Sequence, residues 1–137
     1  MTLDEIVALR NALIGDATLT SMVSEENIRV GWVSIVNSFP SIIITQVGGI
    51  AKGMLGYSAS TTGNKLRRNE GTIQFDILST TSRAETLQIA DRIEKIFLDG
   101  ISDFQSFTKT SDMDMYDEEA KVYRKIQVWK YIRLMYD

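Results

Sequence analysis

The chain has 137 residues, of which 44% are hydrophobic and 24% are charged, and its formal net charge is −3. This length and apolar content suit one soluble domain with a single core. A net acidic chain lacks the basic surface typical of a dedicated DNA-binding module. The sequence contains no cysteine and no histidine, which excludes disulfides, thiol chemistry and the commonest general base and metal ligand.

The amino-terminal segment MTLDEIVALR carries acids where a secretory signal needs basic residues, and no apolar run is long enough to span a bilayer. The sequence therefore predicts a protein that is made in the cytoplasm and has no membrane contact.

The first third of the chain predicts one helix, a helical turn and two strands. Thr2 and Glu5 have the spacing of a capping box, and apolar residues then follow helical spacing up to Gly15, which predicts a helix of about three turns. Residues 16–23 predict a helical turn, and residues 28–32 a short strand. The strongly β-prone run from Ile42 to Val47 follows the sole proline, Pro40, and a proline suits the entry to a strand because it cannot donate to a ladder.

Residues 48–69 form the most unusual stretch of the sequence. The segment GGIAKGMLGYSASTTGNKLRRN is rich in glycine, serine and threonine, contains no acid, and carries four basic residues: Lys52, Lys65, Arg67 and Arg68. Its composition predicts a long flexible loop, and connections of this length are functional or disordered more often than not. Two interpretations stay open: a plain hairpin connection kept soluble by its charges, or a loop that orders on a partner.

The second half predicts a strand, a helix and a closing hairpin. Residues 71–78 alternate apolar and polar side chains, which predicts a strand paired with the one before the loop. Ser82 and Glu85 form a second capping box, and the apolar face that follows predicts a helix ending near Gly100. An extended run over 104–116 and a turn over 117–120 lead into the final strand, 121–136. The fold class predicted is α+β: an antiparallel sheet with two helices packed on it.

The closing strand is apolar on both faces. Such a strand needs two packing partners, because a half-buried strand normally shows one polar face. One hypothesis is that the aromatic face contacts another subunit; the other is that the strand is covered within a single domain. The aliphatic face holds Val122, Ile126, Val128, Ile132 and Leu134, and the aromatic face holds Tyr123, Trp129, Tyr131 and Met135.

No motif in the sequence indicates catalysis. A calcium loop starting at Asp112 would need glycine at its sixth position and glutamate at its twelfth, but these are Asp117 and Tyr123. Asp112 and Asp114 share a strand face but have no nucleophile or oxyanion donor nearby in the sequence. The glycines of 48–56 match neither a dinucleotide fingerprint nor a phosphate loop. The sequence therefore predicts a protein that is not an enzyme and has no cofactor or metal.

Three blocks of the sequence carry a resemblance that spans most of the chain. They are FPSIIITQVGG from residue 39, GTIQFDILSTTSRAETLQIADRIEKIF from residue 71 and YDEEAKVYRKIQVWKY from residue 116. Their order resembles that of the tail-completion or tail-terminator (head-tail joining) proteins of long-tailed bacteriophages. Residues at positions that match the family pattern are Pro40, Asp76, Tyr116, Tyr123, Arg124 and Trp129.

The resemblance implies a single domain over residues 1–137 that assembles into a ring, expected to be a hexamer. The ring would cap the completed tail tube at the head-proximal end of the virion, between the major tail tube protein and the head-tail connector protein. DNA would pass through its lumen without specific binding. Two alternatives stay open: another head-tail connector or minor tail subunit, and a monomeric ligand-binding or regulatory α+β domain.

A head-to-tail ring would join opposite charges on neighbouring subunits. Glu118 and Glu119 lie in the predicted turn, and five basic residues follow it: Lys121, Arg124, Lys125, Lys130 and Arg133. The expected interface residues are Lys65, Arg67, Arg68, Glu118, Glu119, Tyr123, Arg124, Trp129 and Tyr131.

Overall fold

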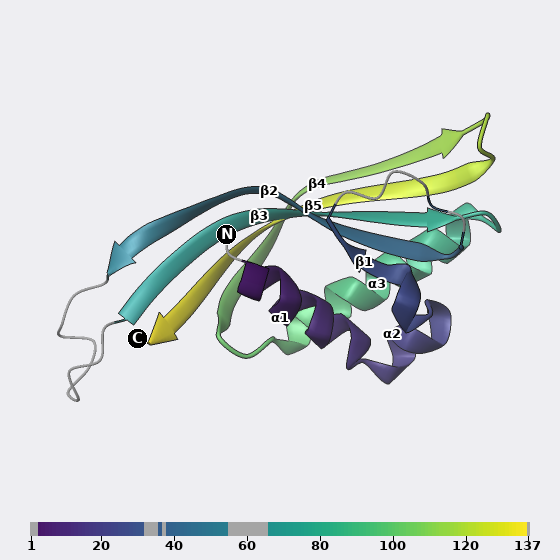
Figure 1. The fold of residues 1–137 in the computed structure, drawn as a ribbon. Coiled ribbons are helices and arrows are strands. Elements are labelled where there is room, and N and C mark those ends of the chain that lie inside the picture. The colour runs from purple at the N-terminus through teal and green to yellow at the C-terminus, as the bar shows by residue number, and fades with distance from the viewer. Residues whose placement is uncertain (1–2, 32–35, 37, 55–65, 137) are drawn as a thin grey trace.

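The computed structural model describes residues 3–31, 36, 38–54 and 66–136. In this part of the chain three α-helices pack against a five-stranded sheet, which confirms the α+β fold class (Figure 1). The helices are α1 (Leu3–Ile14), α2 (Ala17–Met22) and α3 (Arg83–Asp99), with a 3₁₀ turn at Glu25–Asn27. The strands are β1 (Ile28–Val30), β2 (Ser41–Met54), β3 (Leu66–Ser79), β4 (Phe104–Asp117) and β5 (Val122–Tyr136).

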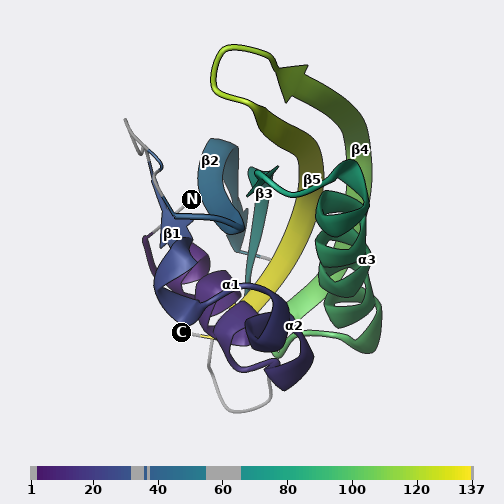
Figure 2. The ribbon, with the colours of Figure 1, turned by 90° about the vertical axis from the view of Figure 1, so that its right-hand side faces the viewer.

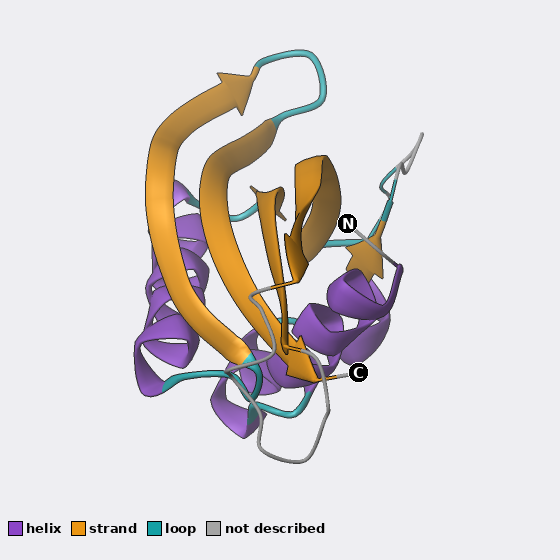
Figure 3. Cartoon of the chain, turned by 90° about the vertical axis from the view of Figure 1, so that its left-hand side faces the viewer, coloured by secondary structure: helices purple, strands orange, loops and turns teal. Residues whose placement is uncertain are grey.

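The sheet has the order β1-β2-β3-β5-β4. The hairpin pairs β2–β3 and β4–β5 are antiparallel, as predicted, and β3 also pairs antiparallel with β5, whereas the short edge strand β1 runs parallel to β2. The strands curve together, and the helices lie against one face of the sheet (Figures 1 and 2). The opposite face, which we call the helix-free face, is turned toward the viewer in Figure 3.

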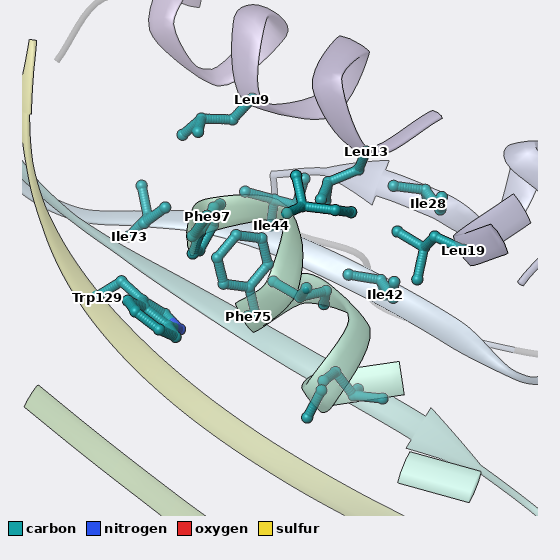
Figure 4. Packing of buried hydrophobic residues seen from close by; sticks show 14 of the residues in the cluster. Leu9, Leu13, Leu19, Ile28, Ile42, Ile44, Ile73, Phe75, Phe97 and Trp129 are labelled. Carbon is teal, nitrogen blue, oxygen red and sulfur yellow. The ribbon is translucent and has the colours of Figure 1, made fainter. Parts of the chain in front are cut away.

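The core lies between the sheet and the helices. Side chains from the helix-covered face of β2 and β3, such as Ile44 and Phe75, are completely buried against Leu9 and Leu13 of α1 (Figure 4). Complete burial of such a side chain is worth about 1.5–3 kcal/mol relative to leaving it exposed. These contacts fix the helices on one face of the sheet and leave the other without a helical cover.

The ends of α3 follow the predicted local signals. The Ser82 hydroxyl accepts a hydrogen bond from the Glu85 N–H at 3.2 Å, and Gly100, at φ 96°, closes the helix by donating to the carbonyls of Ile96 and Phe97. The Glu85 carboxylate accepts instead from the Ser79 hydroxyl at 2.6 Å. The amino-terminal cap is therefore tied to the end of β3.

The prediction of a loop over residues 48–69 is wrong for the described part of that segment. Residues 48–54 and 66–69 extend the β2–β3 hairpin, with Gly49 opposite Gly71 and Lys52 opposite Arg68. The glycines lower the strand propensity, but β3 is paired over its whole length with β5 and offers β2 a complete ladder. Two register shifts in β2 accommodate the irregular sequence. Residues 55–65, including Lys65, lie outside the described residues.

Candidate interaction surfaces

The two faces of β5 have different environments. Lys125, Gln127, Trp129 and Tyr131 are buried on the helix-covered face. The alternate side chains point to the helix-free face, because successive residues of a strand face opposite sides. Four of them are aliphatic and half-buried: Ile126, Val128, Ile132 and Leu134.

Trp129 and Tyr131 of β5 belong to the core of the chain itself, which corrects the prediction that these two residues contact another subunit. Trp129 is only 4% exposed and packs edge-to-face on Phe97 of α3, with ring centroids 4.9 Å apart (Figure 4). Tyr131 is 1% exposed and packs on Phe104 at 5.5 Å. The sequence left both faces of the strand possible, and α3 covers the aromatic one.

A buried carboxylate ties α1 to the sheet. Glu5 is fully buried and accepts hydrogen bonds from the Asn69 amide at 2.7 Å and from the Tyr131 hydroxyl. Burial and, secondly, this contact with Glu5 raise the pKa of Tyr131 far above its ordinary value, so the phenol stays a donor at every physiological pH. The Glu5 side chain was expected to cap α1; its Thr2 partner lies outside the described residues. These hydrogen bonds stabilise the packing of α1 on β3 and β5, which is a structural role.

Five acidic residues lie between positions 112 and 119, and the first two, Asp112 and Asp114, are neutralised within the chain. The Lys125 side chain, 5% exposed, places its ammonium 2.7 Å from Asp112 Oδ1 and 3.3 Å from Asp114 Oδ1. Arg83 reaches Asp114 at 2.9 Å, and Lys109 reaches Asp112 at 3.0 Å. Among the described residues, no group of three or more potential ligands could hold a metal ion.

These contacts shift the pKa values of the groups involved. Burial alone would raise the pKa of both carboxyls. Hydrogen bonds from Lys125 and Lys109 nevertheless lower the pKa of Asp112. Hydrogen bonds from Arg83 and Lys125 lower the pKa of Asp114 in the same way. Burial opposes the charge of Lys125 as well, yet its two carboxylate partners raise its pKa. The cluster is therefore ionised and internally paired at neutral pH.

The turn of the β4–β5 hairpin projects past the helices (Figures 2 and 3). All residues from 108 to 121, which we call the arm, are exposed. The Asp117 carboxylate closes the turn by accepting from the N–H groups of Glu119 and Ala120 at 3.0 and 3.1 Å, and Lys121 takes a left-handed φ of 56°. Neither Glu118 nor Glu119 has an ion-pair partner in the part of the chain that the structure describes.

The helix-free face carries an apolar band around one ion pair. Register places Met113 beside Ile126, and Ile126 beside Asp76. Arg124 Nη2 lies 3.1 Å from Asp76 Oδ2, and the Gln74 amide donates to the other oxygen of Asp76 at 3.1 Å. The two methionines of the arm, Met113 and Met115, are 51% and 48% exposed.

A groove of about 650 Å³ lies at one side of the helix-free face. The Arg124–Asp76 pair and apolar side chains such as Ile43 and Val122 line it. Among its polar side chains, Gln74 and Arg124 both contact Asp76, and the described lining residues include no nucleophile paired with a base. The groove is therefore suited to contact with another surface.

The expected interface residues lie at separate places on the molecule. Arg68 pairs with Glu70 at 2.8 Å on the part of the hairpin remote from Glu118 and Glu119, and Tyr123 packs on Tyr116 at 4.7 Å. The structure describes the backbone of Arg67 but not its side chain. The basic residues of β5 were expected to meet acidic residues of a neighbouring subunit. For Arg124 and Lys125 this expectation is corrected, because both pair with aspartates of the same chain.

None of the helices among the described residues is long and apolar enough to cross a membrane. Comparison with protein-family models and with curated proteins gives no match. Among solved structures, the fold is similar to that of a chain in the virion of a native gene transfer agent (GTA) particle. The TM-score is 0.61 at 12% sequence identity, and the similarity covers 94% of this chain and 93% of the other. At this identity the comparison establishes a shared fold.

Proposed function

We propose that this protein is a structural component of a phage-like virion: a tail terminator that forms a ring at the head-proximal end of the tail. The observation that carries this proposal is the fold shared, over nearly the full length of both chains, with a component of a GTA virion. The resemblance of three sequence blocks to tail-terminator proteins points to the same role independently of the coordinates.

The environment of the polar residues supports a structural role without catalysis. Two buried side chains that could serve as acids or bases have internal partners: Tyr131 donates to Glu5, and Lys125 is held by two aspartates. The surfaces that remain available for contact with other proteins are the exposed arm and the helix-free face of the sheet. Exposed apolar groups gathered on one face mark a contact site in many soluble proteins.

The proposed partners are further copies of the chain in a ring of six, the major tail tube protein below it and the head-tail connector protein above it. DNA would cross the lumen without specific contacts, which agrees with the net acidic charge. Another connector or a minor tail subunit would use the same kind of surfaces. The groove of about 650 Å³ is the observation that favours the alternative of a monomeric ligand-binding domain.

The proposal is tested by adding the purified protein to polymerising tail tube protein. A terminator should bind the growing end, so electron micrographs should show shorter tubes with a density at one end, at substoichiometric ratios. Light scattering of the protein alone should show an assembly larger than a monomer at high concentration. A strict monomer that leaves tube length unchanged would exclude this function and favour the ligand-binding domain.

A further inference from the structure

We propose that the acidic tip of the arm, formed by Asp117, Glu118 and Glu119, docks on Lys130 on the helix-free face of a second copy of this chain. The contact would join copies head to tail and would set their register. This inference depends on the self-assembly proposed above and names the surfaces that perform it.

The tip carries charge that the chain itself does not balance. Asp117, Glu118 and Glu119 face a single ammonium, that of Lys121, in the turn. Asp117 is used within the turn, and the two glutamates are exposed without an ion-pair partner among the described residues. The carboxylates nearer to the helices, Asp112 and Asp114, differ because Lys125 and its neighbours already pair with them.

Lys130 is the complementary group on the helix-free face. It is exposed and has no ion-pair partner in the described part of the chain, in contrast to Arg124 and Arg68, which pair with Asp76 and Glu70. Register places Thr72 and Thr108 directly beside it on the two neighbouring strands. A lysine between hydroxyl groups on an open sheet face can accept a carboxylate without displacing an existing partner.

The tip cannot reach Lys130 of its own chain. Val122 at the start of β5 and Lys130 are separated by eight residues of one continuous strand, which spans about 26 Å at about 3.3 Å per residue. The contact is therefore possible only between copies. Because the tip and Lys130 are different patches of the subunit, repeated docking is heterologous and closes into a ring when the rotation permits.

Apolar side chains beside both patches supply the affinity that exposed ion pairs lack. A surface ion pair contributes about 0–1 kcal/mol, so charge selects the partner and the register more than it holds the contact together. Met115 and Tyr116, each 48% exposed, precede the tip, and the half-buried Val128 and Ile132 flank Lys130 on the same face. A second copy would cover these apolar groups, and the tip of its arm carries charge opposite to that of Lys130 beside them.

The test reverses the charge on each patch separately and then mixes the two proteins. One variant is Glu118→Lys/Glu119→Lys and the other is Lys130→Glu; circular dichroism checks that both stay folded. Each variant alone places like charges together, so sedimentation velocity should show self-association at least tenfold weaker than that of the wild type. An equimolar mixture restores opposite charges at every contact and should recover the wild-type assembly.

Matched controls reverse exposed charges outside the two patches. Glu25→Lys/Glu26→Lys alters two adjacent exposed glutamates of the 3₁₀ turn, and Lys95→Glu alters an exposed lysine of α3. Both controls should assemble like the wild type. High salt should weaken the wild-type assembly, since exposed charges are screened.

The outcomes separate the failure of this inference from the failure of the proposed function. A wild-type protein that stays monomeric contradicts self-assembly itself. A wild type that assembles, with reversed variants that assemble equally well or a mixture that stays dissociated, overturns the tip–Lys130 contact alone. An assembly that stops at a dimer would show a symmetric contact and would also overturn the head-to-tail arrangement.

Discussion

Gly71 of β3 lies directly opposite Tyr131 of β5, and the phenol ring occupies the space where any larger residue would place its Cβ. The close approach lets the Tyr131 hydroxyl reach the buried Glu5 carboxylate of α1. One missing side chain in the sheet thus creates the space for a contact between the first helix and the last strand.

Replacement of Gly71 by alanine should destabilise the protein by about 1–3 kcal/mol, the usual cost of overpacking a core. The methyl group would overlap the ring of Tyr131, which packing against Phe104 holds in place. Chemical denaturation measures the loss. The variant Tyr131→Val alone and combined with Gly71→Ala completes a double-mutant cycle, and the cost of the alanine should largely disappear in the valine background. An equal cost in both backgrounds would contradict the steric explanation.

Replacement of Tyr131 by phenylalanine should cost about 1–3 kcal/mol, since it removes a hydrogen bond from a carboxylate that water cannot reach. Tyr123→Phe is the matched control: the Tyr123 ring is half-buried against Tyr116, and the change should stay within about 0.5 kcal/mol. Urea denaturation midpoints compare the two. Equal midpoints would show that the Glu5 contact does not contribute to stability.

The local signals of the sequence were sufficient for most elements of the fold. The helix between Ser82 and Gly100 has its start and stop residues within a few positions of its ends, and the alternation of 71–78 specifies one buried face. Residues 48–54 were missed because their strand depends on β3, a partner distant in sequence, while their own glycines indicate a loop. Pairing of this kind overrides weak propensity.

The candidate surfaces were harder to predict than the fold. Periodicity divided β5 into an aliphatic and an aromatic face, but only the position of Phe97 on α3 decides that the aromatic face is internal. Lys125 illustrates a second limit, since its charge looks exposed in the sequence and is buried between two aspartates of β4. Contacts between strands decide which charges remain available to a partner.

Trp129 and its neighbour Val128 provide a direct test of which face of β5 is internal. Trp129→Ala should destabilise the fold by about 3–5 kcal/mol, because it empties a well-packed position against Phe97. Val128→Ala removes a half-buried side chain from the helix-free face and should cost much less stability. Thermal unfolding and sedimentation of both variants give the comparison. A Trp129→Ala protein that is as stable as the wild type but does not assemble would show that the aromatic face forms the contact between subunits.

Lys125 should be important for the order of the arm. In Lys125→Ala, Asp112 and Asp114, two residues apart on the same face of β4, lose their shared ammonium, and neighbouring like charges repel. Relative to the wild type, the rate of amide hydrogen exchange should increase more in residues 108–121 than in α3. Lys121→Ala, which removes an exposed lysine from the turn, is the control and should leave exchange in β4 unchanged. Uniform acceleration across the whole chain would instead indicate global destabilisation.

The ion pair between Asp16 and Arg92 should make stability depend on pH in the acid range. Arg92 Nη2 lies 2.6 Å from Asp16 Oδ1 and its Nε lies 2.7 Å from Oδ2, so the guanidinium joins the start of α2 to α3. The hydrogen bond from Arg92 is the main cause that lowers the pKa of Asp16; burial opposes it, and the Leu19 N–H adds to it.

A carboxyl with a lowered folded pKa stabilises the protein fully above its unfolded pKa, about 3.9, and the contribution is lost as the pH falls through the folded value. Asp16→Asn keeps a competent helix cap but loses the charge. It should be less stable than the wild type at neutral pH, and the difference should shrink below about pH 4. Asp91→Asn, at an exposed aspartate of the same helix as Arg92, should show no such trend. Urea denaturation between pH 7 and pH 3 measures both variants, and a difference that stays constant over this range would contradict the ionic contribution.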